Sequence, residues 1–166
     1  GLSPGGVCTT AVDLLDLFPT ILEAAGVDPE PDMQGRPGRS LLQLAAAPAD
    51  HGRPIFSEYH AAGSNTAAFM LRKGRWKYHY YVGFAPELFD LETDPQELND
   101  LAPDPAHADV LRDIEAGLRQ IGDPEAIDRQ AKQDQRALIE RFGGVEKASH
   151  IGAKGATPAP GAAVAS

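Results

Sequence analysis

The sequence predicts an α+β fold, in which a small antiparallel sheet of about four strands is packed by helices and followed by a disordered or extended tail. Three observations carry this prediction. Apolar and polar residues alternate on both sides of Lys73-Gly74, which is typical of a β-hairpin. Apolar residues recur at helical spacing in 106–121. Residues 145–166 are rich in Ala, Gly and Pro, and their few large apolar side chains cannot offset the entropy cost of ordering them.

Four strands are expected in the middle of the chain. Residues 54–60 form the first strand, and the second and third flank the turn at Lys73-Gly74, where Gly74 can take a positive φ. Residues 88–91 form the fourth. The aromatic strand from Trp76 to Tyr81 could stack on single-stranded nucleic acid. The negative net charge of the chain disfavours binding to nucleic acid, so packing of these rings in the core is the better interpretation.

Helices are expected before and after the strands along the chain. Asp13 or Asp16 can cap a helix that tolerates Pro19 in its first turn and ends at Gly26. After the fourth strand, Asp94 is expected to cap another helix. Pro95 would stand at the first position of that helix, with Glu97 reaching back to the cap. The remaining expected helical segments are a turn at 40–44, a helix at 106–121 and a last helix from 123 to about 142, stopped by Gly143-Gly144.

Length, composition and net charge exclude several classes of function. A chain of 166 residues can bury one core, and its net charge of −9 argues against a nucleic-acid surface or a polybasic membrane contact. The single cysteine allows no internal disulfide. No apolar run approaches a membrane span and the first residues do not resemble a signal peptide. The chain lacks an initiator Met, which indicates a piece of a longer protein, and the compartment stays open between cytoplasm and periplasm.

Few residues form a sequence pattern that by itself indicates a catalytic, metal-binding or ligand-binding role. The five histidines are scattered without metal-ligand spacing, so the chain is expected to bind no metal unaided. Cys8 has no basic neighbour that would lower its pKa, which favours an ordinary thiol over a nucleophile. His60 ends the first predicted strand and opens a loop that contains Ser64 and Asn65, where polar side chains are commonly displayed for binding. A hydrogen-bonded structural histidine is the alternative interpretation of His60.

Three blocks of the sequence resemble one family. They are 12–27 (VDLLDLFPTILEAAGV), the pair 33–36 (MQGR) with 40–42 (SLL), and the hairpin with 88–97 (LFDLETDPQE). Together they are similar to the C-terminal part of the sulfatase family, within the alkaline phosphatase superfamily. The resemblance covers roughly residues 7 to 142, and Asp100 stands where such sequences usually have Asn.

The resemblance implies a hydrolase with an α/β core and a smaller C-terminal antiparallel-sheet domain. Its nucleophile would be a formylglycine made in a Cys/Ser-x-Pro-x-Arg motif, beside calcium or another divalent metal. Cys8 lacks the Pro and the Arg of that motif, so the resemblance implies that this chain holds no catalytic or metal-binding residue and is silent in isolation. The implied organisation is the end of the catalytic-domain region in 1–53, the C-terminal sheet subdomain in 54–142 and the tail in 143–166.

The function implied by the resemblance is hydrolysis of small-molecule sulfate esters by the intact parent protein, with the upstream catalytic domain as partner. This chain would add a wall of the substrate cleft, where His60, Ser64 and Asn65 are the expected substrate-binding residues. A phosphonate monoester or phosphodiester hydrolase of the same superfamily is one alternative. A non-catalytic assembly module is another, in which 125–142 and the tail pack on a neighbouring subunit to form a homo-oligomer.

Overall fold

The computed structural model describes residues 5–29, 35–60 and 64–150. It divides into two compact units, residues 1–124 and 125–166. The predicted tail beyond residue 150 lies outside the described residues, as do the MQ of the MQGR block and part of the loop after His60.

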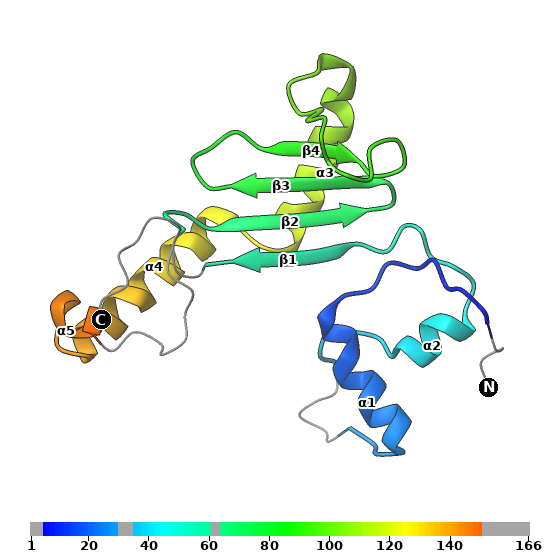
Figure 1. Ribbon diagram of the computed structural model, residues 1–166, viewed down its shortest axis with the longest axis horizontal. Helices are drawn as coiled ribbons and strands as arrows, with labels where there is room; N and C mark the ends of the chain where they lie inside the picture. Colours follow the sequence, from blue (N-terminus) through cyan, green and yellow to red (C-terminus); the bar gives the residue numbers. More distant parts are fainter. Residues whose placement is uncertain (1–4, 30–34, 61–63, 151–166) are drawn as a thin grey trace, which may run out of the picture. The chain divides into compact units, whose positions relative to one another are not determined.

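The first unit contains a four-stranded antiparallel sheet with strand order β1-β2-β3-β4 (Figure 1). Its strands are β1 (Ile55–Tyr59), β2 (Ala68–Lys73), β3 (Trp76–Tyr81) and β4 (Glu87–Asp90). Lys73 pairs with Trp76 across a two-residue turn in which Gly74 has φ 60°. The four predicted strands and the α+β fold class are therefore confirmed.

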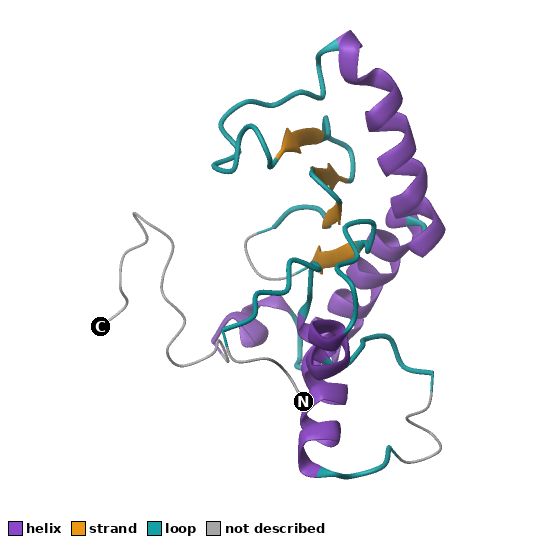
Figure 2. Cartoon of the chain, turned by 90° about the vertical axis from the view of Figure 1, so that its right-hand side faces the viewer, coloured by secondary structure: helices purple, strands orange, loops and turns teal. Residues whose placement is uncertain are grey.

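One face of the sheet is covered by α3 (Ala108–Ile121), which follows a short 3₁₀ turn, η3 (Pro105–His107) (Figure 2). Leu71, Tyr78 and Leu88 stand opposite one another on neighbouring strands, and each is at most 1% exposed. Residue 117 of α3 is a glycine, and a Cβ there would lie 3.3 Å from Leu71 Cδ2. The helix therefore packs close to the sheet, and its Ile114 and Leu118 complete the core.

The helix expected at Asp94 is absent, and the prediction was wrong. Residues 91–100 form turns, and Glu97 has φ 57°, a left-handed conformation that an α-helix cannot continue. Both Glu97 carboxylate oxygens accept from Lys77 Nζ at 2.7 Å instead of reaching back to Asp94. The Asp94 carboxylate accepts from the Asn99 N–H at 2.8 Å. Asp94 and Glu97, which were expected to cap a helix, therefore stabilise a turn instead.

Asp100, the departure from the usual Asn, holds the turn region to the sheet. Its Oδ1 accepts from the backbone N–H of Leu88 at 3.0 Å and of Ala102 at 2.9 Å. The amide oxygen of an asparagine can accept the same two bonds. Asp100 therefore makes the same two hydrogen bonds that an asparagine at this position could make.

The N-terminal segment is irregular up to a 3₁₀ turn, η1 (Leu14–Asp16), which Asp13 caps. Helix α1 (Leu17–Ala25) follows with Pro19 in its first turn and ends at Gly26 with φ 66°. Helix α2 (Leu41–Ala46) begins after the cap Ser40, whose side chain accepts from Leu42 N. Residues 7–12 form neither a strand nor a helix and lead directly into η1.

Asp16 ties three separate parts of this unit together. Its side chain is fully buried and accepts from Arg53 at 2.7 and 2.8 Å, from Arg39 N at 2.8 Å and from Asp13 N at 3.0 Å. Arg53 also donates to the Ala11 carbonyl at 2.7 Å. Burial works to raise the pKa of Asp16, but these hydrogen bonds outweigh it and hold the pKa below its ordinary value.

Gly38 allows the loop before α2 to approach η1. It has φ 109°, and a Cβ at this position would lie 2.3 Å from the Leu15 carbonyl oxygen. Any larger side chain would force the backbones apart, next to the bond between Arg39 N and Asp16. The loop path and the Asp16 network therefore depend on the same glycine.

The second unit holds most of α4 (Pro124–Arg141) and all of α5 (Val145–His150). Positive φ values of 89° and 94° at Gly143 and Gly144 end α4 close to the predicted position. Helix α5 was not expected, because 145 onward was predicted to lack structure. Its Glu, Lys and Ala are good helix formers that follow directly on the two glycines. None of the helices in the described ranges is long and apolar enough to cross a membrane.

We predict that Asp16→Asn lowers the free energy of unfolding by about 3–5 kcal/mol, because it leaves the Arg53 guanidinium buried without its counter-charge. The measurement is urea unfolding of the 166-residue chain. Asp109→Asn is the matched control, since Asp109 also pairs with an arginine but is exposed, and its loss should cost less than about 1 kcal/mol. Equal losses in the two variants would contradict the assigned role of Asp16.

Candidate functional site

The predicted site residues lie where β1 ends and β2 begins. His60 follows the last residue of β1, and Ser64 and Asn65 precede β2, while 61–63 lie outside the described residues. Because the strands are antiparallel, β3 ends and β4 begins at this same end of the sheet, at Tyr81 and Glu87 (Figure 1). We call this end of the sheet, with these five residues, the loop end.

The core orients His60. Its ring meets the Phe69 ring edge-on, with 5.6 Å between centroids and 79° between planes. Phe69 is 2% exposed, so the contact fixes the imidazole against a rigid partner. His60 Nε2 lies 3.6 Å from Glu58 Oε2, and the side chain is 23% exposed. This geometry suits a structural histidine and equally suits a histidine held in place for binding.

Ser64 and Asn65 are exposed and stand on an anchored stretch of backbone. The Ser64 hydroxyl donates to the Thr66 carbonyl. Thr66 Oγ1 donates to the Val82 carbonyl at 2.7 Å, and Val82 N donates to the Ala67 carbonyl at 3.2 Å. These bonds tie the second half of the loop to the end of β3. Asn65 is thus displayed to solvent from a fixed backbone.

Sequence reasoning missed a polar and aromatic group on β3 and β4. Tyr81 OH donates to Glu87 Oε2 at 3.0 Å, and the His79 ring stacks on Tyr81 and meets Phe89 edge-on. Burial, together with the Lys77 charge, lowers the pKa of His79, and burial with the Glu87 bond raises the pKa of Tyr81. The alternation of residues 77, 79 and 81 along one strand is the signal that could have placed them on one face.

The residues that the structure describes do not fit the cofactors that the family resemblance implies. No group of three or more His, Cys, Asp or Glu within them could hold a metal ion. Cys8 is exposed, and its Sγ–H donates to the Leu44 carbonyl at 3.5 Å. Hydrogen bonds from the Thr10 side chain and backbone lower the pKa of Cys8.

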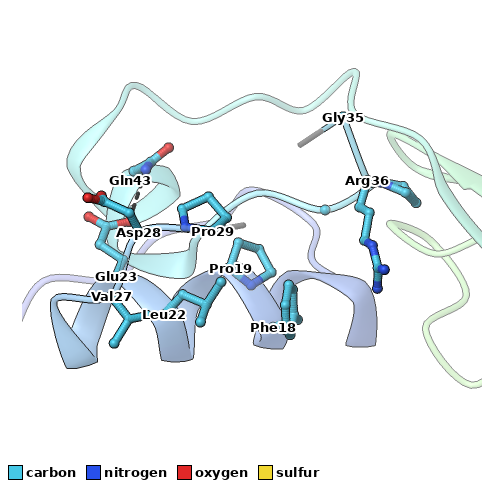
Figure 3. A pocket seen from close by; sticks show the side chains of 12 residues that line it. Phe18, Pro19, Leu22, Glu23, Val27, Asp28, Pro29, Gly35, Arg36 and Gln43 are labelled. Atoms are coloured by element: carbon cyan, nitrogen blue, oxygen red, sulfur yellow. Dashed lines mark hydrogen bonds between the residues drawn. The ribbon is translucent and has the colours of Figure 1, made fainter. Parts of the chain in front are cut away.

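A cavity of about 350 Å³ is lined by α1 together with residues 27–29 and 35–38, and none of the loop-end residues lines it (Figure 3). Its walls are mainly apolar, with Phe18, Pro19 and Leu22 on α1 and Pro29 across from them. A hydrogen bond of 2.9 Å from Gln43 to Glu23 lies at one end. The lining also includes the charged residues Glu23, Asp28 and Arg36.

Comparison with known proteins gives one family. Residues 1–123 match the family described as N-sulphoglucosamine sulphohydrolase, C-terminal. Among curated relatives, arylsulfatase K of Danio rerio is 34% identical over 137 residues, which cover 78% of this chain and 25% of that protein. The chain therefore spans about a quarter of the length of this relative.

Solved structures share the fold. One, described as a sulfatase from Bacteroides thetaiotaomicron, has a TM-score of 0.54 and 30% identity, covering 74% of this chain and 26% of its own. The phosphonate monoester hydrolase of Silicibacter pomeroyi has a TM-score of 0.58 and 27% identity, covering 72% and 26%. With the family match over most of its length, the chain belongs to the sulfatase family, whose C-terminal region it represents.

Proposed function

We propose that this chain is the C-terminal part of a hydrolase that acts on sulfate esters. The match of residues 1–123 to a sulphohydrolase C-terminal region carries the proposal. In this organisation, residues 1–53 complete the catalytic-domain region, 54–142 form the C-terminal sheet subdomain and 143–166 form the tail. The nucleophile, as formylglycine, and calcium or another divalent metal would be supplied by the upstream catalytic domain of the same protein.

The proposed contribution of this chain is one wall of the substrate cleft, built from His60, Ser64 and Asn65. The His60 imidazole can exchange a hydrogen bond with an ester oxygen or with the leaving group. The exposed Asn65 amide offers two donors and one acceptor oxygen, which suits a small polar ester. The edge-on contact of His60 with Phe69 and the anchoring of Thr66 to Val82 support this role, since both hold the wall in place before substrate arrives.

A phosphonate monoester hydrolase is the second candidate, because one solved enzyme of that class has a TM-score of 0.58 with this chain. The sequence relatives favour sulfate, since arylsulfatase K and a choline-sulfatase of Rhizobium meliloti are 34% and 33% identical. Fold alone does not distinguish the two esters.

We expect the intact parent to hydrolyse 4-nitrophenyl sulfate with a kcat/KM at least about tenfold above that for 4-nitrophenyl phenylphosphonate. A tenfold ratio corresponds to about 1.4 kcal/mol of transition-state discrimination. Steady-state kinetics on both esters at matched pH and metal concentration give the ratio. A ratio below one would move the assignment to the phosphonate hydrolases.

His60→Ala in the intact parent should lower kcat/KM for the sulfate ester by about tenfold, the loss expected for one hydrogen bond to substrate. His60→Gln, which keeps a donor and an acceptor, should recover part of it. His51→Ala is the matched control, because His51 is an exposed histidine on the loop before β1. Thermal melting separates a folding defect from a binding defect. Unchanged turnover and unchanged KM in a folded His60→Ala enzyme would sink the proposed role.

We propose separately that the C-terminal helix and tail can join copies of the parent into a homo-oligomer. Much of α4 presents exposed side chains, among them Leu138 at 52% exposure, with Phe142 just beyond its end. Light scattering of the intact parent and of a form truncated after Phe142 should show a lower mass for the truncated form. Identical masses would count against this assembly.

A further inference from the structure

We infer that the sheet carries, at its β2–β3 turn, a binding site for a saccharide that bears an anionic group. The site is a cavity of about 370 Å³ beside this turn, and we call it the turn cavity. It lies at the end of the sheet opposite the loop end, because β2 begins and β3 ends at the loop end, whereas the turn joins their other ends. The inference concerns a second ligand site and does not depend on the proposed function.

Three separate segments of the first unit line the turn cavity. They are the loop before β1, the β2–β3 turn and the first half of α3, whose lining side chains are His51, Lys73, Trp76, Val110, Asp113 and Ile114. A Cβ on Gly74 would lie 3.4 Å from the His51 carbonyl oxygen, so the loop rests against the turn. Lys73 and Trp76 pair across the turn and therefore share one face of the sheet.

The Trp76 indole gives the cavity a rigid aromatic wall. The guanidinium carbon of Arg75 lies 5.4 Å from the indole centroid, and the His107 ring meets the indole edge-on, with 5.8 Å between centroids and 65° between planes. Val110 and the buried Ile114 extend the apolar lining. An aromatic ring that is already fixed can pack against the C–H groups of a pyranose ring at little cost in conformational entropy.

The turn also offers a positive charge that is not neutralised within the described residues. Residues 72–77 (RKGRWK) hold four of the fifteen Lys and Arg of a chain whose net charge is −9. Two of the four, Arg75 and Lys77, are paired with carboxylates. Lys73 is exposed, lines the cavity and makes no hydrogen bond or ion pair with another described residue. Its ammonium group is therefore available for charge-assisted hydrogen bonds to an anion.

Two further polar side chains complete the site. His51 and Asp113 are exposed, line the cavity and make no side-chain hydrogen bond to another residue in the described ranges. The Asp113 carboxylate can accept from sugar hydroxyls, and the His51 imidazole can donate to a hydroxyl or an anionic oxygen. Apolar and aromatic walls with a few polar groups are typical of small-molecule sites of this volume. An anionic sugar would use the aromatic wall, the carboxylate and the ammonium group together.

Saturation-transfer NMR of the intact parent tests the inference with glucose, glucose 6-sulfate and glucuronate as probes. Sulfate and carboxylate share the chemistry that pairs with Lys73, so at least one anionic sugar should bind about tenfold more tightly than glucose. The tighter of the two identifies the anion. Equal affinity for all three sugars, or no transfer to any of them, would overturn the inference.

Substitutions locate the binding in the turn cavity. Lys73→Ala should weaken binding of the tighter anionic sugar by about tenfold and leave that of glucose unchanged, whereas Trp76→Leu should weaken both. Arg72→Ala is the matched control, because it removes the neighbouring charge from a residue on the opposite side of the strand that does not line the cavity. Equal losses in Lys73→Ala and Arg72→Ala would indicate unspecific charge attraction and refute the site. Because Lys73 and Arg72 are exposed, this pair decides the question even where Trp76→Leu fails to fold.

The loop end provides the remaining comparison. His60→Ala should leave the affinity for the anionic sugar unchanged, since His60 lies at the other end of the sheet. A loss in His60→Ala without a loss in Lys73→Ala would place the sugar at the loop end and contradict the inference. These readouts report binding and not turnover. A parent that binds the sugar through Lys73 yet hydrolyses no sulfate ester would refute the proposed function alone.

Discussion

The first unit depends on one buried carboxylate. A carboxylate offers about four acceptor positions, and Asp16 fills them with two guanidinium N–H groups of Arg53 and the backbone N–H groups of Arg39 and Asp13. Removing a charge from water costs several kcal/mol, and that cost is met only when every acceptor position is used. The start of α1, the loop before α2 and the lead into β1 are therefore fixed together or not at all.

A second carboxylate, that of Asp90 at the end of β4, also accepts several hydrogen bonds, one set of them from an arginine. Asp90 accepts from the Arg75 guanidinium, from the Thr93 hydroxyl at 2.8 Å and from Glu92 N at 3.2 Å. The hydrogen bonds with Arg75 hold the pKa of Asp90 well below its ordinary value, against the opposing effect of burial. Arg75 and Asp90 belong to the blocks that make the family recognisable. Their observed contacts are structural, since they join the start of β3 to the turn after β4.

Local patterns predicted most of the fold because the hairpin and the long helices are set by near neighbours. Alternation around Gly74 and the apolar face of α3 needed no distant partner. The helix at Asp94 failed for the opposite reason, since Glu97 is drawn to Lys77, twenty positions earlier, into a backbone conformation that capping rules do not anticipate. Asp16 was expected only as a cap, because its partner Arg53 lies 37 positions away.

At the loop end, too, features set by neighbouring residues could be predicted, whereas contacts between residues far apart in the sequence could not. The position of His60 after a strand was readable, but its contact with Phe69 depends on the pairing of β1 with β2, and the Tyr81–Glu87 bond depends on the connection from β3 to β4. These contacts give the site two kinds of side chain. His60 is oriented by its contact with Phe69 in the core, whereas Asn65 is exposed on an anchored backbone. In the proposed cleft wall, the first would fix the position of a polar ester and the second would adapt to its substituent, since a hydrogen bond from an already ordered side chain costs less conformational entropy.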